Sequence, residues 1–142
     1  CNRDALLSSR ADLSIIPVVG PEVLSGSTRM KAGTATKMVL NMLSTGAMVQ
    51  MGKTYGNLMV DMNATNVKLA ERAKRIVSTL TELNGEKAAE LLSRSNGELK
   101  TAIVMHRLDL SPEQARSSLH AARGHLRRAL EAGVRSTGNG QV

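Results

Sequence analysis

The chain has 142 residues, a formal net charge of +7, and one tyrosine as its only aromatic residue. A chain of this length forms one domain by default and can bury a sizeable core, which here must be aliphatic, with eight methionines to fill irregular gaps. The single cysteine excludes an intrachain disulfide, and no apolar run is long enough to span a bilayer. With no signal-peptide pattern, these features favour a cytoplasmic protein outside the membrane.

The basic excess is spread along the chain. Residues 1–64 carry 6 basic and 4 acidic groups, and residues 65–142 carry 13 and 8. No run exceeds two adjacent cations, and there are no aromatic side chains on which bases could stack. We therefore expect a solvated basic surface and no nucleic-acid partner. The alternative is a helical protein that binds a partner or nucleic acid through its basic C-terminal half.

Residues 13–19 (LSIIPVV) have the pattern of a short buried strand. Pro17 suits the end or the edge of a strand better than its centre. No earlier segment forms a clear partner strand, and a lone strand cannot satisfy its own backbone groups. We therefore expect the chain to begin inside an α/β domain, at the last strand of that domain.

The next segment, residues 20–34 (GPEVLSGSTRMKAGT), carries the strongest functional signal. Its glycines let the backbone approach a ligand, and free N–H groups at the start of a following helix attract anions. Ser27, Thr28, Arg29 and Lys31 add donors and positive charge. This pattern predicts a site for a phosphorylated small molecule at the carboxyl end of the strand. Because it matches neither a P-loop nor a dinucleotide fingerprint, a turn that merely caps the helix is the alternative.

Residues 34–51 have the pattern of a helix that is apolar over a wide face. Such a helix should be buried against a sheet or a second subunit. Thr34 or Thr36 could cap its start. Residues 53–63 are ambiguous between a second short strand and an extended connection.

A clear amphipathic helix is predicted over residues 65–83, and Asn84-Gly85 is typical of a C-terminal stop. It would form the connecting element over residues 65–84. After it, residues 88–92 (AAELL) align with 115–119 (ARSSL), and 97–104 (GELKTAIV) with 124–131 (GHLRRALE). This weak repeat predicts two helix–turn–helix units.

The second unit begins with Ser111-Pro112-Glu113-Gln114, which predicts an N-cap, a proline in the first turn and a capping box. Residues 85–132 resemble a compact helical module of the ubiquitin-associated type. We expect this module to pack onto its parent domain, although such modules can also bind partners. Residues 133–142 are predicted to be a disordered tail.

The string GPEVLSGSTRMKAGTATK resembles the signature of the N-acetylmuramic acid 6-phosphate etherases and of their relative, the glucokinase regulatory protein. Residues 38–61 are similar to the etherase branch in particular. The resemblance covers about residues 1–130. It implies a mostly α chain whose residues 1–64 end a sugar isomerase-type (SIS, flavodoxin-like three-layer) α/β domain, followed by the helical module.

The resemblance also implies a function. Members of the etherase branch are cytoplasmic, cofactor-independent lyases of amino sugar catabolism and peptidoglycan recycling. They cleave the D-lactyl ether of N-acetylmuramic acid 6-phosphate by elimination and hydration, which gives N-acetylglucosamine 6-phosphate and D-lactate. The substrate is a sugar phosphate, and the resemblance implies a homodimer. The alternative is a non-enzymatic sugar-phosphate sensor, as in the glucokinase regulatory protein.

The acid–base glutamates of that family belong to the earlier part of the domain, and their motifs are not in this chain. We therefore expect no catalytic residue here and no activity of the chain by itself. Glu22, the one carboxylate of the loop, could orient a sugar hydroxyl or brace backbone N–H groups. Arg29 could pair with the phosphate or the lactyl carboxylate. His106, His120 and His125 do not have metal-ligand spacing.

Overall fold

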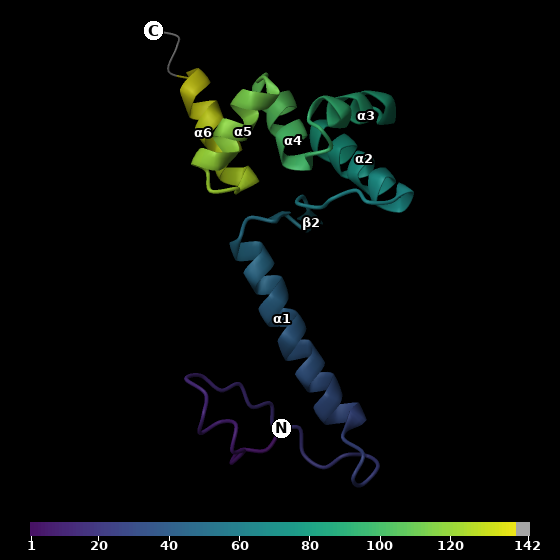
Figure 1. Ribbon diagram of the computed structural model, residues 1–142, viewed down its shortest axis with the longest axis vertical. Helices are drawn as coiled ribbons and strands as arrows, with labels where there is room; N and C mark the ends of the chain where they lie inside the picture. The colour runs from purple at the N-terminus through teal and green to yellow at the C-terminus, as the bar shows by residue number, and fades with distance from the viewer. Residues whose placement is uncertain (139–142) are drawn as a thin grey trace. The chain divides into compact units, whose positions relative to one another are not determined.

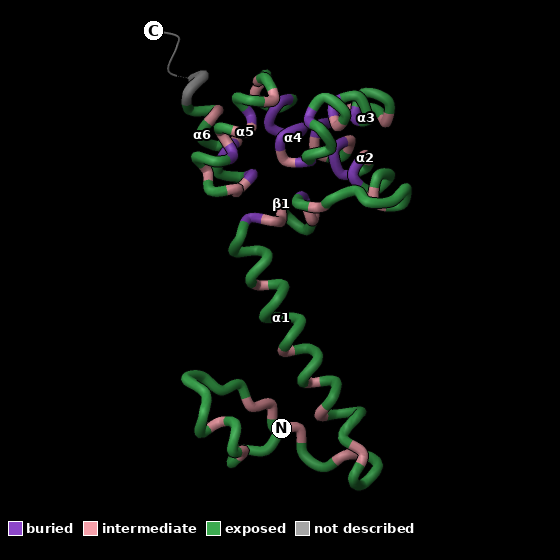
Figure 2. Tube along the Cα trace, in the orientation of Figure 1, coloured by how far each residue is buried: buried purple, intermediate pink, exposed green. Residues whose placement is uncertain are grey.

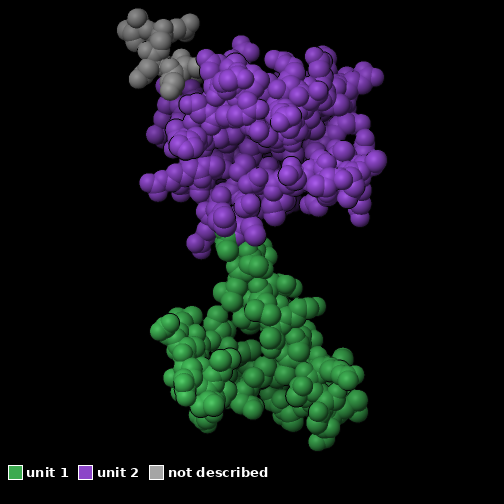
Figure 3. Space-filling view, viewed as in Figure 1, with its two compact units in different colours: residues 1–47 green, residues 48–142 purple. Residues whose placement is uncertain are grey.

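The computed structural model describes residues 1–138, in two compact units: residues 1–47 (unit 1) and the chain from residue 48 onward (unit 2) (Figures 1 and 3). The described part is mostly helical, as expected. In chain order its elements are the π-helical turn η1 (Arg29–Gly33), α1 (Thr34–Gln50), β1 (Thr54–Tyr55), β2 (Leu58–Met59), α2 (Val67–Thr81), α3 (Gly85–Arg94), α4 (Leu99–Leu108), α5 (Pro112–Ala121) and α6 (Leu126–Gly138). None of the described helices is both long and apolar enough to cross a membrane.

The strand predicted over residues 13–19 does not form. This segment is irregular backbone, and the exposed fractions of the Leu13, Ile15 and Val18 side chains are 80%, 52% and 53%. A strand needs a neighbour to accept and donate its backbone hydrogen bonds, and unit 1 offers none. The prediction was therefore wrong for this structure. The sequence pattern of a strand is present, but unit 1 contains no second strand with which it could pair.

The long apolar helix is present, but its start and its burial differ from the prediction. Helical backbone already begins at Arg29, so neither Thr34 nor Thr36 caps the start of the helix. No residue of α1 is buried (Figure 2), and the side chains of Met42 and Leu43 are more than half exposed. Unit 1 contains no sheet or second helix against which this apolar face could pack.

Unit 2 opens with a small antiparallel hairpin, which resolves the ambiguity of residues 53–63. Thr54 pairs with Met59 and Tyr55 with Leu58. Gly56, in the turn, has φ +58°, a conformation that favours glycine. The segment thus contains two short paired strands, where the sequence left open one short strand or an extended connection.

The core of unit 2 is built around α4, which packs against α2, α3, α5 and α6. Its buried apolar side chains are aliphatic, as the composition requires. They are Val60, Ala73, Ile76, Val77, Ala88, Leu91, Leu99, Ala102, Ile103, Val104, Met105, Ala115, Leu119, Leu126 and Ala129. Figure 2 shows this burial concentrated in the helices of unit 2.

The predicted repeat corresponds to two similar helix pairs, α3–α4 and α5–α6. Each first helix ends in a residue with positive φ followed by a glycine, Asn96-Gly97 in one pair and Arg123-Gly124 in the other. The glycine N–H donates to the carbonyl five residues earlier, at 2.8 Å in both pairs. This is the Schellman type of helix end, and it gives both pairs the same turn.

The starts of α2, α3 and α5 are set by side-chain caps. The Ser111 capping box is present as predicted, with both reciprocal hydrogen bonds. Asn84, expected to end α2, instead caps α3 by accepting from the Lys87 N–H at 2.9 Å. The end of α2 is Glu82, in the left-handed region at φ 62°. The stop was misplaced because asparagine followed by glycine suits a helix start as well as a helix end.

The region predicted to be a disordered tail is partly helical. Residues 133–138 continue α6, while residues 139–142 lie outside the described residues. Adding residues to an existing helix costs little, since each new residue gains one hydrogen bond. Gly133 also lets α6 approach α4, because a Cβ at this position would lie 2.3 Å from a methyl carbon of Leu108.

Candidate functional site

The loop before α1 is organised by the carboxylate of Glu22. Its two oxygens accept the backbone N–H groups of Lys31 and Ala32, each at 3.0 Å. The hydrogen bond from Ala32 has the larger effect and that from Lys31 the next, and together they hold the pKa of Glu22 below its ordinary value. Of the two roles considered for Glu22, the structure therefore shows the bracing of backbone N–H groups.

Two further hydrogen bonds close the loop onto itself. The Lys31 ammonium donates to the Pro21 carbonyl at 2.9 Å, and the Gly33 N–H donates to the Thr28 carbonyl at 3.0 Å. A Cβ at Gly33 would lie 3.2 Å from that same Thr28 oxygen, so a larger residue would press on the loop. The loop thus has a defined conformation held from within.

This geometry corrects the expectation of free N–H groups for part of the helix start. The N–H groups of Lys31, Ala32 and Gly33 already have acceptors, and a carboxylate occupies the position that a bound anion would take. A phosphate at this loop would therefore find these three N–H groups already paired.

The side chains left available are those of Ser27, Thr28 and Arg29. Within residues 1–138 none of them makes a hydrogen bond or an ion pair. Ser27 is half-buried, and Thr28 and Arg29 are exposed. The guanidinium offers a bidentate donor set that matches phosphate or carboxylate. The five predicted site residues thus divide into two whose side chains hydrogen-bond within the loop, Glu22 and Lys31, and three whose side chains do not.

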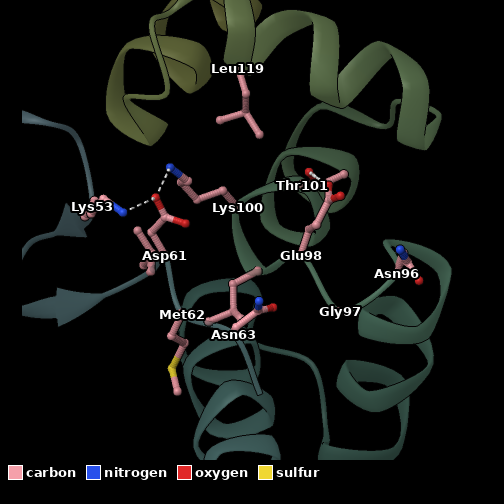
Figure 4. Close-up of a pocket in the computed structure, with 12 residues that line it drawn as sticks. Lys53, Asp61, Met62, Asn63, Asn96, Gly97, Glu98, Lys100, Thr101 and Leu119 are labelled. Carbon is pink, nitrogen blue, oxygen red and sulfur yellow. Dashed lines mark hydrogen bonds and ion pairs between the residues drawn. The ribbon is translucent and has the colours of Figure 1, made fainter. Parts of the chain in front are cut away.

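A pocket that was not predicted from the sequence lies wholly in unit 2. It has a volume of about 450 Å³ and lies between the segment after β2 and the start of α4 (Figure 4). Asp61 accepts from Lys100 at 3.0 Å and lies 3.7 Å from the ammonium of Lys53. Lys100 also donates to the Gly124 carbonyl at 3.1 Å, which joins both helix pairs to the hairpin segment.

The other charged group of this pocket is Glu98. It accepts from the Thr101 hydroxyl at 2.7 Å and from the Arg116 Nε at 2.9 Å. The hydrogen bond from the Thr101 hydroxyl has the largest effect, and together with Arg116 it holds the pKa of Glu98 below its ordinary value. The carboxylates of the pocket already have partners from the protein, so we interpret the cluster as a clamp between elements. Asp61 and Lys100 are 39 residues apart, and no local spacing signals their contact.

Among the described residues, no group of three His, Cys, Asp or Glu side chains could hold a metal ion.

Comparison with known proteins bears on the whole chain. No family model matches it. An N-acetylmuramic acid 6-phosphate etherase of Rhodopirellula baltica is 54% identical over 130 residues, which is 92% of this chain and 43% of that protein. The etherase of Pasteurella multocida is 52% identical over 130 residues, with the same coverage. The etherase of Salmonella paratyphi B is 55% identical over 131 residues, which is 92% of this chain and 44% of that protein.

This chain is a relative of the N-acetylmuramic acid 6-phosphate etherases. The resemblance inferred from residues 20–37 and 38–61 is confirmed, and it extends over nearly all of the chain. The chain spans less than half the length of these curated relatives. The match therefore includes the loop of Glu22 and Arg29. More than half of each relative's sequence lies outside the match.

Proposed function

We propose that this chain is the C-terminal part of a lyase that cleaves the D-lactyl ether of N-acetylmuramic acid 6-phosphate. The observation that carries the proposal is the identity of 52–55% to proteins named as such etherases. In the parent protein, residues 1–64 would complete a sugar isomerase-type domain, and residues 85–132 would form a module of the ubiquitin-associated type. The reaction is an elimination followed by hydration, and its products are N-acetylglucosamine 6-phosphate and D-lactate.

The loop would contribute binding rather than proton transfer. An elimination needs a general base, a general acid and an anchor for the phosphate. Glu22 is unsuited to the first two roles, since both oxygens accept N–H groups and its pKa is lowered. Arg29, with Ser27 and Thr28, supplies the anchor for the phosphate or the lactyl carboxylate. Glu22 and Lys31 hold the loop in the shape that presents these groups.

The test is D-lactate release from N-acetylmuramic acid 6-phosphate by the intact parent protein. We expect Arg29→Ala to lower kcat/KM about 10- to 100-fold, because a hydrogen-bonded charge pair is lost. Lys37→Ala is the matched control, since Lys37 is an exposed cation of α1 outside the loop and should leave the rate unchanged. An unaffected rate in Arg29→Ala would remove Arg29 from the site.

Two further outcomes separate the enzyme from its alternatives. The 142-residue chain alone should release no D-lactate, and any release would show that it holds its own acid–base groups. A parent protein that binds the phosphosugar without releasing D-lactate would instead be a sensor of the glucokinase regulatory type.

We also propose that the parent is a cytoplasmic homodimer without a cofactor. The exposed apolar face of α1 supports burial against a further surface in the parent, which the rest of its domain or a second subunit would supply. Sedimentation of the intact parent would give the mass of two chains. A monomer at micromolar concentration would contradict the dimer and leave the etherase assignment intact.

A further inference from the structure

The second helix pair carries an open groove along its surface. The groove has a volume of about 310 Å³ and lies between α5 and α6. Its lining combines small side chains with two cations: Ser118, Ala121, Ala122, Arg123, Arg128 and Ala132. Small residues allow the backbone of a packed helix to come close. We call this feature the α5–α6 groove.

The internal repeat shows what such a surface does in the first pair. Positions 27 residues before Ser118, Ala122, Arg128 and Ala132 are Leu91, Ser95, Thr101 and Met105, and all of these are buried. The counterparts of Ala121 and Arg123 are Arg94 and Asn96, which are exposed, so Arg123 lies at the rim of the comparable surface. Both helices of the first pair, α3 and α4, pack against α2. In addition, α4 packs against α5 of the second pair. The first pair therefore has helical neighbours beyond its own two helices, and the four positions are buried there.

The equivalent surface of the second pair is not covered in unit 2. Arg128 and Ala132 are exposed, and Ser118 and Ala122 are half-buried. The α5–α6 pair lies at the end of the unit away from α2 and α3, and α4 is the described helix of unit 2 that packs on it (Figure 1). One flank of this pair thus lacks the neighbour that its counterpart has.

The cations of the groove indicate the charge of the missing neighbour. Within the described part of the chain, the guanidinium groups of Arg123 and Arg128 make no hydrogen bond or ion pair, and both side chains are exposed. Two guanidinium groups beside a floor of alanines complement carboxylates that flank a narrow apolar stripe. We propose that the α5–α6 groove docks an acidic amphipathic helix of a partner protein. Small apolar side chains of that helix enter the groove, and its Asp or Glu residues pair with Arg123 and Arg128.

The test is binding of a synthetic helical peptide to the 142-residue chain, followed by fluorescence anisotropy. The peptide carries alanine and leucine on one face with glutamates beside them. Its control is a peptide of the same composition with the glutamates scrambled around the helix. We expect saturable binding of the first peptide that weakens at least tenfold in the double variant Arg123→Glu, Arg128→Glu. Arg94→Glu, an exposed arginine of α3 with the same charge change, should bind normally.

A second variant tests the shape of the groove without changing its charge. Ala132→Met introduces the residue found at the equivalent position of the first pair, Met105. Its larger side chain fills the groove and should also weaken binding of the peptide. Equal binding of the scrambled peptide, equal loss in Arg94→Glu, or no binding of the designed peptide at low salt would each overturn the proposal. So would binding to the chain but not to the intact parent, since the parent itself would then cover the groove. None of these results depends on D-lactate release.

Discussion

Glu22 lies where the sequence suggested a bound phosphate, and its carboxylate takes the place of that anion at the helix start. Its hydrogen bonds to the N–H groups of Lys31 and Ala32 favour the ionised form, so its pKa is lower in the folded loop than in the unfolded chain. The stabilisation is therefore fully present above the unfolded pKa and is lost as the pH falls through the folded pKa.

The pH dependence of this loop can be followed at the two N–H groups. We expect the amide proton shifts of Lys31 and Ala32 to titrate together, with a midpoint below that of an ordinary glutamate. NMR spectra recorded between about pH 2 and pH 7 give this midpoint. Glu22→Gln should abolish the titration. A midpoint at or above the ordinary value would show that the carboxylate does not brace the loop.

Gly52 and Gly56 form a matched pair for testing backbone constraints in the hairpin region. Both have positive φ, at +70° and +58°, but a Cβ at Gly52 would lie 2.9 Å from His125 whereas Gly56 has open space around it. Gly56→Ala should cost about 1 kcal/mol of unfolding free energy from its backbone conformation. Gly52→Ala should cost at least about 2 kcal/mol, since a clash is added. Urea unfolding followed by circular dichroism measures both, and equal losses would contradict the close contact.

At the scale of the element, the helix pairs of unit 2 are governed by short local signals. The Ser111 capping box lies where the sequence predicts it, and the Asn96-Gly97 and Arg123-Gly124 turns supply the turns of the two predicted helix–turn–helix units. Such signals depend on neighbours within a few residues, so a sequence shows them directly. Asn84 was misassigned because its side chain can serve either helix beside it, and only the backbone geometry decides.

The cap at Ser111 should carry a measurable part of the stability of α5. Ser111→Ala removes the acceptor of the Gln114 N–H and should lower the unfolding free energy by about 1 kcal/mol. Ser117→Ala is the control, because Ser117 is exposed within the same helix and its change should stay within about 0.5 kcal/mol. Urea unfolding of both variants makes the comparison, and a similar loss in Ser117→Ala would show that the cap is not the cause.

At the scale of the whole chain, predictions failed where distant parts had to meet. The strand over residues 13–19 needs a pairing partner that unit 1 does not supply, and the apolar face of α1 needs a surface. The Asp61–Lys100 contact joins segments 39 residues apart with no periodic signal between them. For the candidate site, the sequence identified the loop and its residue types. It left open whether Glu22 touches a ligand or the backbone.

Burial also predicts how stability is distributed along the chain. Residues 1–47 contain no buried side chain, whereas α4 contains six. Backbone amides open readily where few apolar contacts must be broken. Hydrogen exchange followed by mass spectrometry should therefore show fast exchange over residues 1–28 and the slowest exchange in α4. Comparable protection of the two segments would mean that unit 1 has a core of its own.

The half-buried ring of Tyr55 has a practical consequence for spectroscopy. Since the chain has no tryptophan or phenylalanine, its ultraviolet emission comes from this one phenol. The ring lies in the hairpin of unit 2, with the guanidinium of Arg127 from α6 5.4 Å from its centroid. Emission intensity thus reports on the attachment of the hairpin to α6 and is silent about residues 1–47. An unfolding curve recorded by intrinsic fluorescence would describe unit 2, and a different probe is needed for the loop of Glu22.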